Sequence, residues 1–144
     1  MAQISKEFMI DASSDAVYKA LTEASEFEKF TGMPVKIDLS PGGEASLFNG
    51  YIKGYFIEFK KSERLIMAWK DCYNWEDGEY SILNLTFTQI NSKTRLCWYQ
   101  EGIPEREVAH LEDGLERKYI NPLQEYLSSG QVISSPVPDT CQIT

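Results

Sequence analysis

Six short apolar runs joined by tight turns occupy residues 35–101, and they leave few possible folds for the chain. The runs read VKIDLS, EASLFNG, YIKGYFIEFKK, RLIMAWKD, EYSILNLTFTQI and TRLCWYQE. The turns between them carry Pro41-Gly42-Gly43, Asn49-Gly50, Asp77-Gly78 and Asn91-Ser92. Parallel strands need crossovers of about a dozen residues or more, whereas antiparallel strands close over a few turn residues. The spacing therefore predicts an antiparallel meander.

One strand and two short helices are expected ahead of the meander. The run at 3–10 alternates polar and apolar residues, which predicts a first strand. Ser13 or Ser14 is expected to cap a helix, because a serine hydroxyl accepts a hydrogen bond from an amide of the first turn. A second short helix is expected at about 24–30, and Gly32 ends it.

A long amphipathic helix is expected after the meander. Behind Pro104, apolar residues recur every three or four positions, at Val108, Leu111, Leu115, Tyr119, Leu123 and Leu127. This spacing predicts about five to six helical turns with one apolar stripe. Pro122 lies inside the helix, lacks a backbone N–H and clashes with the turn before it. We therefore expect a bend near residues 118–121.

The order of elements predicts an α+β fold, in which a curved antiparallel sheet of about seven strands wraps around the last helix. Such a wrap commonly leaves a cavity between sheet and helix, and aromatic residues make up 12% of this chain. Eight residues are candidates for lining that cavity: Trp69, Trp75, Tyr80, Leu85, Phe87, Trp98, Leu115 and Tyr119. Aromatic residues also dominate ordinary packed cores, so a filled interior is the alternative.

The sequence offers little for catalysis or for metal binding. Its single histidine, His110, falls on the polar side of the last helix, where an ordinary solvated residue is expected. No cysteine or histidine lies three or four positions after it, so no metal site is predicted. Glycines form no phosphate loop either, because no helix and no lysine follow Gly42-Gly43. Together with Gly50 and Gly78, these glycines are predicted to form turns, and we expect no enzyme activity and no cofactor.

Charge and cysteine content narrow the possible partners and the location. The net charge is −8, and no stripe of Lys and Arg is present, so nucleic acid and anionic membrane are poor partners. Three widely spaced cysteines suggest free thiols and a reducing compartment, which predicts a cytoplasmic protein. Neither a signal peptide nor a membrane span is expected. Residues 1–128 are expected to form one domain, and the Ser- and Pro-rich 129–144 a flexible tail.

Several segments, taken in order, resemble a known family. They are FTGMPVKIDLSPGGEASLFNGYIKGYF at 30–56, RLIMAWK at 64–70, NWEDGEYS at 74–81, LTF at 85–87 and GIP at 102–104. Together they resemble the C-terminal domain of the activator of heat-shock protein 90 ATPase, which belongs to the START-like (SRPBCC) superfamily. This resemblance implies the helix-grip fold over about residues 4–127.

The same resemblance implies a function. It implies a non-catalytic co-chaperone that binds heat-shock protein 90 and favours the closed state of its ATPase cycle. The alternative is a carrier or sensor of a small hydrophobic ligand, as some START-like proteins are, and a cyclase-like enzyme ranks third. Where the family usually has Gly-Trp in the last helix, this chain has Gly114-Leu115, so the groove beside the helix is expected to differ. The Asn- and Trp-rich motif of the family's N-terminal domain is absent from the sequence.

Overall fold

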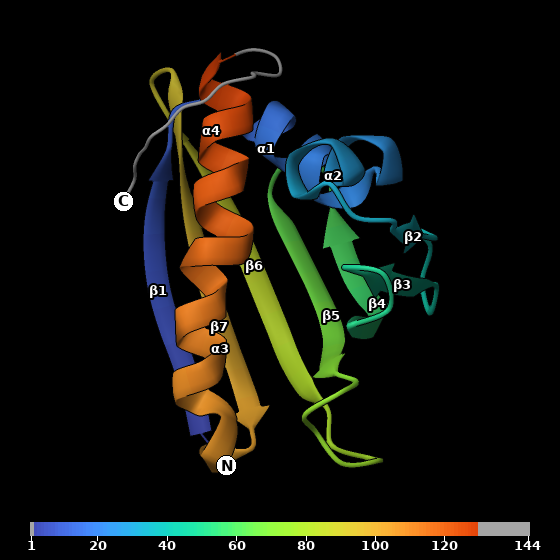
Figure 1. Cartoon of the computed structure of the whole chain (residues 1–144). Helices are drawn as coiled ribbons and strands as arrows, with labels where there is room; N and C mark the ends of the chain where they lie inside the picture. The colour runs from blue at the N-terminus through green and yellow to red at the C-terminus, as the bar shows by residue number, and fades with distance from the viewer. Residues whose placement is uncertain (1, 130–144) are drawn as a thin grey trace.

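A single antiparallel sheet of seven strands forms the body of the structure, a computed structural model that describes residues 2–129 (Figure 1). The strands run β1 (Ala2–Ile10), β2 (Lys36–Ile37), β3 (Glu44–Leu47), β4 (Ile52–Lys60), β5 (Arg64–Asp71), β6 (Ser81–Ile90) and β7 (Lys93–Ile103). Their order across the sheet is β1-β7-β6-β5-β4-β3-β2, and all neighbours are antiparallel. The meander is therefore confirmed, although the expected strand VKIDLS is reduced to two residues.

One continuous helical stretch lies along the concave face of this sheet (Figure 1). It consists of η1 (Glu105–Glu107), α3 (Val108–Gly114), η2 (Leu115–Ile120) and α4 (Asn121–Ser129). Two short helices, α1 (Ser14–Thr22) and α2 (Ala24–Thr31), pack beside its C-terminal end. A curved sheet that grips a long C-terminal helix is the α+β helix-grip architecture, and the fold prediction is confirmed.

The ends of the short helices follow from their capping residues. The Ser13 hydroxyl accepts a hydrogen bond of 3.2 Å from the amide of Ala16, so Ser13 caps α1. Gly32 ends α2 in the left-handed conformation with φ of 72°, and its amide donates to the carbonyl of Glu28. Both helix boundaries lie within one or two residues of the predicted ones.

Pro122 alters the long helix in the turn that precedes it in the sequence. A regular α-helix would have the amide of residue 122 donate to the carbonyl of Lys118, and proline has no such amide. Residues Leu115–Ile120 instead form a π-helical segment, in which the amide of Asn121 donates to Glu116. We expected a bend near residues 118–121, and the irregularity observed there is a widened helical turn.

Glycines occupy the turn that enters β3 for steric reasons. Gly42 has φ of 79°, a conformation that other residues rarely adopt. A Cβ atom on Gly43 would lie 2.1 Å from the carbonyl oxygen of Asp38. Gly50 and Gly78 also adopt positive φ and lie in turns, as Gly42 does, and the amide of Gly43 donates to the carbonyl of Ser40 across the first turn.

The concave face of the sheet carries the hydrophobic core and a buried series of linked hydrogen bonds. The indole N–H of Trp98 donates to Gln100, whose amide nitrogen donates to the hydroxyl of Ser81. That hydroxyl donates in turn to the backbone carbonyl of Trp69. Gln100 and Ser81 are fully buried, so each polar group needs such a partner. This series of hydrogen bonds links β7, β6 and β5 within the core.

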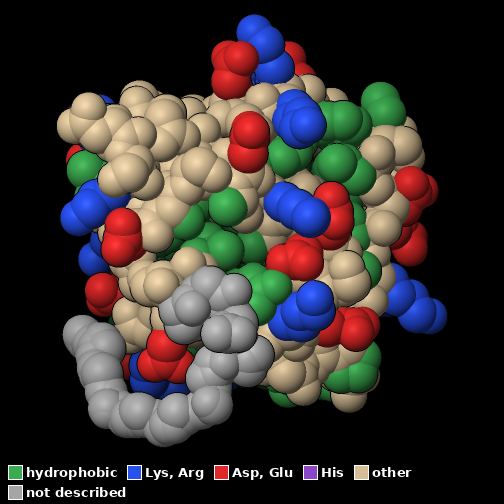
Figure 2. Space-filling view, turned by 90° about the horizontal axis from the view of Figure 1, so that it is seen from above, with side chains coloured by type: hydrophobic (Ala, Val, Ile, Leu, Met, Phe, Trp, Pro, Cys, Tyr) green, Lys and Arg blue, Asp and Glu red, His purple; other side chains and the backbone are tan. Residues whose placement is uncertain are grey.

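Charges of both signs are mixed on the face shown in Figure 2, viewed from the end where α1 and α2 lie. Lys and Arg side chains alternate there with Asp and Glu, around a central group of hydrophobic atoms. Within residues 2–129, no helix combines the length and the apolar character needed to span a membrane. The expected tail at 129–144 lies outside the described residues, except that Ser129 ends α4.

Candidate functional site

A cavity of about 330 Å³ lies between the long helix and one end of the sheet. The helix contributes residues of α3, η2 and the start of α4, and the sheet contributes the β3–β4 turn and the end of β5. Its apolar wall is formed by Met33, Phe48, Ile52, Trp69, Trp75, Leu111, Leu115, Tyr119 and Pro122. A volume of this size falls at the lower end of the range of small-molecule pockets.

Tyr119 stands at the back of this cavity and is held by three other rings. The rings of Phe27, Phe48 and Trp98 surround it edge-on, with distances between ring centroids of 5.9, 5.0 and 5.1 Å. The indole N–H of Trp69 points to its hydroxyl at 3.5 Å. Burial raises the pKa of Tyr119 well above the usual tyrosine value, because the phenolate would lose its solvation. The back wall is thus rigid and nonpolar apart from one hydroxyl.

Four of the eight residues that the sequence suggested for a cavity lie on its wall: Trp69, Trp75, Leu115 and Tyr119. The other four lie elsewhere, and here the expectation is corrected. Leu85, Phe87 and Trp98 are buried on the concave face of β6 and β7, where neighbouring side chains fill the space. Tyr80 is 38% exposed, because it precedes β6 and packs against Tyr55 on the outer side of the sheet. Whether the four wall residues contact a ligand stays a prediction.

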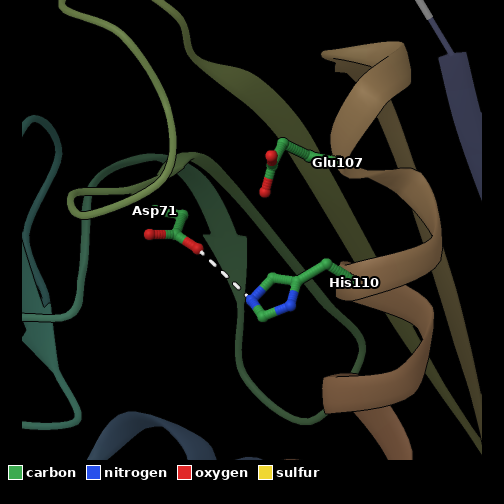
Figure 3. A group of neighbouring side chains, drawn as sticks. All are labelled: Asp71, Glu107 and His110. Atoms are coloured by element: carbon green, nitrogen blue, oxygen red, sulfur yellow. Dashed lines mark ion pairs between the residues drawn. The ribbon is translucent and has the colours of Figure 1, made fainter.

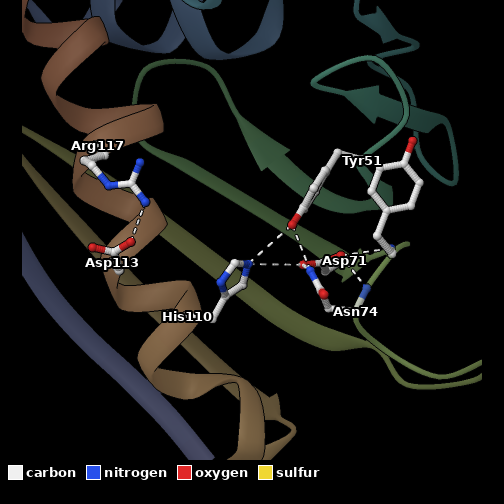
Figure 4. Close-up of polar contacts among 7 residues, drawn as sticks. Tyr51, Asp71, Asn74, His110, Asp113 and Arg117 are labelled. Carbon is white, nitrogen blue, oxygen red and sulfur yellow. Dashed lines mark hydrogen bonds and ion pairs between the residues drawn. The ribbon is translucent and has the colours of Figure 1, made fainter.

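Polar side chains that line the cavity or lie next to it are close to one another (Figure 3, Figure 4). The hydroxyl of Tyr51 lies 3.3 Å from Nε2 of His110 and accepts a hydrogen bond of 2.8 Å from the side-chain amide of Asn74. His110 Nε2 also lies 3.9 Å from Oδ2 of Asp71. These four residues come from the β3–β4 turn, the end of β5, the loop after it and the long helix. We call this group the polar rim.

Asp71 is the buried member of the polar rim, and its carboxylate closes the turn after β5. Its Oδ1 accepts hydrogen bonds of 2.9 Å from the amides of Tyr73 and Asn74. Oδ2 accepts one of 2.8 Å from the side chain of Asn74. Burial, and then the negative charge of Asp71, raise the pKa of the neighbouring Tyr51. The carboxylate is therefore fixed in one orientation and sets the electrostatics of the rim.

His110 is exposed, as predicted, but it also makes contacts that the sequence did not indicate. Its side chain is 53% exposed, yet it lines the cavity and contacts Tyr51 and Asp71, which precede it by 59 and 39 positions in the sequence. Sequence reasoning also missed Tyr51, Asp71 and Phe48 as cavity residues. A local signal for Asp71 existed, since it ends an apolar strand run and precedes a loop. No local signal pairs it with His110.

Basic side chains lie further along the helix at the same opening. The ammonium of Lys118 lies over the ring of Tyr51, 5.3 Å from its centroid. Arg117 pairs with Asp113 one helical turn away (Figure 4). The cavity thus combines an aromatic interior with an opening that carries both positive and negative groups, an arrangement suited to binding an apolar body with a polar end.

An antiparallel sheet closed around a C-terminal helix, with a cavity between them, defines a START-like helix-grip protein. The chain belongs to the family described as activator of Hsp90 ATPase homolog 1-like protein, whose family model matches residues 11–128. An HSP90 activator from Plasmodium falciparum has a similar structure, with a TM-score of 0.77 and 22% identity over 84% of this chain and 92% of that one. CalU16 from Micromonospora echinospora has a TM-score of 0.74 at 22% identity over 89% of this chain and 77% of that one.

Curated relatives match at similar identity but are longer. The human activator of 90 kDa heat shock protein ATPase homolog 1 is 25% identical over 118 residues, which are 82% of this chain and 35% of that protein. The uncharacterized protein C1711.08 of Schizosaccharomyces pombe is 26% identical over 132 residues, 92% of this chain and 39% of that protein. The chain thus spans little more than a third of each of these two relatives.

Proposed function

We propose that this chain binds heat-shock protein 90 and modulates its ATPase cycle without catalysing a reaction itself. The observation that carries the proposal is the family match over residues 11–128, together with relatives that are named activators of this ATPase. Such a protein acts by binding one conformation of the chaperone more tightly than another, so its own surface needs no reactive group. A cytoplasmic location belongs to the same proposal.

Binding and ATPase measurements with purified proteins test this function. We expect the chain to bind heat-shock protein 90 with a dissociation constant of tens of micromolar or tighter, as weak specific contacts do. A large excess of the chain should then change the chaperone's rate of ATP hydrolysis. Calorimetry that detects no binding at about 100 µM would contradict the proposal.

A second candidate function is the carriage or sensing of a small hydrophobic ligand. The observation that favours it is the cavity of about 330 Å³, whose wall consists largely of aromatic and aliphatic side chains. Displacement of a lipophilic fluorescent dye, and native mass spectrometry of the protein purified from cells, would detect such a ligand.

Gly114 allows the two functions to be tested separately. It lines the cavity, and a Cβ atom built on it meets no atom within 4 Å. The Gly114→Phe variant should therefore fill the cavity without displacing the backbone, while Gly114→Ala serves as the matched control. If the ligand function holds, Gly114→Phe loses dye binding and Gly114→Ala keeps it. Equal dye binding by both variants would place the dye outside the cavity and contradict that function.

A further inference from the structure

We propose that Asp71, Glu107 and His110 form a binding site for a divalent transition metal of the Zn²⁺ type, at the rim of the cavity (Figure 3). Each residue offers one ligand atom, and these atoms lie within 4.8 Å of one another. The proposal is independent of any interaction with heat-shock protein 90. It differs from the sequence-based expectation, which found no metal site.

Two of the three ligands share one face of the helical stretch. Glu107 and His110 are three residues apart, a spacing that places side chains next to each other on a helix. Figure 3 shows both side chains directed away from the helix and toward the end of β5. A Glu-x-x-His pair is a common way for one helix to supply two metal ligands.

Asp71 supplies the third ligand from across the cavity, and its position is fixed by other groups. Its side chain is only 5% exposed, and three hydrogen bonds from Tyr73 and Asn74 hold the carboxylate. Its Oδ2 faces His110 Nε2 at 3.9 Å (Figure 3). Metal ligands are usually oriented by partners of this kind, which fix the donor atom before the ion binds.

The site itself carries two carboxylates, while the basic side chains at the same opening, Lys118 and Arg117, lie over Tyr51 and against Asp113. Among residues 2–129, no lysine or arginine lies within 4.0 Å of the carboxylate of Asp71 or of Glu107. His110 is the single potential cation in contact with Asp71 among these residues. Two carboxylates that converge beside an imidazole favour a divalent cation, because it balances both charges.

The ligand set and its mobility both suit Zn²⁺. Imidazole nitrogen and carboxylate oxygen bind this ion at about 2.0–2.2 Å, which places ligand atoms ~3.4 Å apart in a tetrahedron. The ligand atoms therefore need to close by up to ~1.4 Å. The side chain of His110 is 53% exposed and Glu107 is partly exposed, so both have room to rotate toward the fixed Asp71.

Three protein ligands would leave one position of the ion open. His110 and Asp71 both line the cavity, so that position lies at the cavity's edge. Tyr51 places its hydroxyl there, 3.3 Å from the histidine nitrogen. A water molecule or a polar ligand group on the ion would find a hydrogen-bonding partner in this hydroxyl.

The single histidine of the chain makes the test direct. The full-length protein is treated with a chelator, and Zn²⁺ is added while the imidazole nitrogens are followed by ¹⁵N NMR. We expect stoichiometric binding with a large shift of the Nε2 resonance of His110. Calorimetry gives the affinity, and Co²⁺ gives the ligand type from its absorption spectrum. No shift and no heat would overturn the proposal.

Variants separate this site from adventitious binding. Glu107→Gln and His110→Ala should each weaken Zn²⁺ binding at least ~10-fold, because even the loss of a group that only orients a ligand costs about 10–100-fold. Glu116→Gln, an exposed carboxylate on the same helix, is the matched control and should bind as wild type. Equal loss in Glu116→Gln would overturn the proposal, because it would indicate a general effect of surface charge.

Cys72 requires its own control because it neighbours Asp71 and is partly buried. A thiolate is a strong zinc ligand and would produce an intense charge-transfer band with Co²⁺. We expect no such band, and Cys72→Ser should keep the affinity within about twofold. Loss of binding in Cys72→Ser with retention in Glu107→Gln would overturn the proposal in favour of a thiol site.

Discussion

The two parts of the sheet's concave face carry similar residues but are filled to different degrees. Over β6 and β7, Phe87 packs edge-on against Tyr18 at 5.5 Å, and Trp98 packs against Tyr119 at 5.1 Å. Over the end of β5, Trp69 faces a cavity of about 330 Å³. The difference comes from what covers each part, since α1 and the long C-terminal helix closely cover the part over β6 and β7. Whether an inward-facing aromatic residue lies in the packed core or in the cavity wall thus depends on how closely the helices cover it. We call the two parts the packed region and the cavity region.

The largest expected effect separates the two regions by mutation. Trp98→Ala removes a 1% exposed ring and leaves Gln100 without its indole donor. We expect it to lower the free energy of unfolding by about 3–5 kcal/mol. Trp75→Ala, in the cavity wall, should cost about half as much because water can enter the space. Urea denaturation measures both, and equal losses would contradict the distinction between the regions.

Local patterns were sufficient to predict the strands, helices and turns. Alternation with period two identified the strands, and the positions of Leu83, Leu85 and Phe87 identified the inner face of β6. Turn glycines and the capping serine act within a few residues of themselves, so the sequence reveals them directly. The helix-grip assignment then followed from resemblance. Residue type alone did not distinguish cavity-wall residues from packed-core residues, because this difference depends on which helix covers each strand.

The polar rim could not be predicted, because its members come from distant segments. His110 lies just off the apolar stripe of the long helix, and such positions usually face solvent. Here the helix lies inside a curved sheet, so side chains at both edges of its stripe reach other elements. Glu112 reaches Lys6 of β1 on one side at 3.9 Å, and His110 reaches Asp71 on the other. Only the position of the helix on the sheet decides these contacts.

A second prediction tests whether the polar rim has a structural role that the aromatic wall does not provide. Asp71→Ala would leave the amides of Tyr73 and Asn74 without their acceptor. We expect the free energy of unfolding to fall by about 1–3 kcal/mol. Asp77→Ala, in the exposed turn that follows, is the control and should stay within ~0.5 kcal/mol. Chemical denaturation that finds the two variants equally stable would show that water replaces the carboxylate.

A third prediction uses pH to test how far water reaches into the cavity region. Burial raises the pKa of Tyr119 above the usual tyrosine value of about 10, so the folded state resists its ionisation. The resulting stabilisation is complete below pH 10 and is lost as the pH rises further. Between pH 9 and pH 11 we expect Tyr119 alone to contribute a loss of about 1 kcal/mol, because its side chain ionises first in the unfolded chain.

Tyr119→Phe should remove that part of the alkaline loss, since phenylalanine has no proton to release. Tyr73→Phe is the control, because Tyr73 is 71% exposed and lies outside the cavity wall. Urea midpoints at pH 9, 10 and 11 give the slopes. Parallel slopes for wild type and Tyr119→Phe would show that solvent from the cavity reaches the hydroxyl, and the wall would then be less dry than the packed region.

The smallest expected effect is at Gly114, where the polar rim and the aromatic wall meet on the helix. This residue has helical φ and ψ of −72° and −29°, so alanine fits there without strain. A glycine in a helix costs about 0.5–1 kcal/mol relative to alanine, because the unfolded chain loses more freedom. Gly114→Ala should therefore raise the free energy of unfolding by that amount, measured by thermal and urea denaturation.

The same substitution compares the cavity region with an ordinary helix surface. A Cβ atom at position 114 has no neighbour within 4 Å, so any gain comes from the backbone and not from new packing. The gain should then be unchanged when the Trp75→Ala substitution enlarges the cavity, because the two effects share no contact. A gain that disappears in the double variant would mean that the new methyl group packs against the cavity wall. The cavity would then close more readily than its aromatic wall suggests, and the packed region and the cavity region would differ less than the structure indicates.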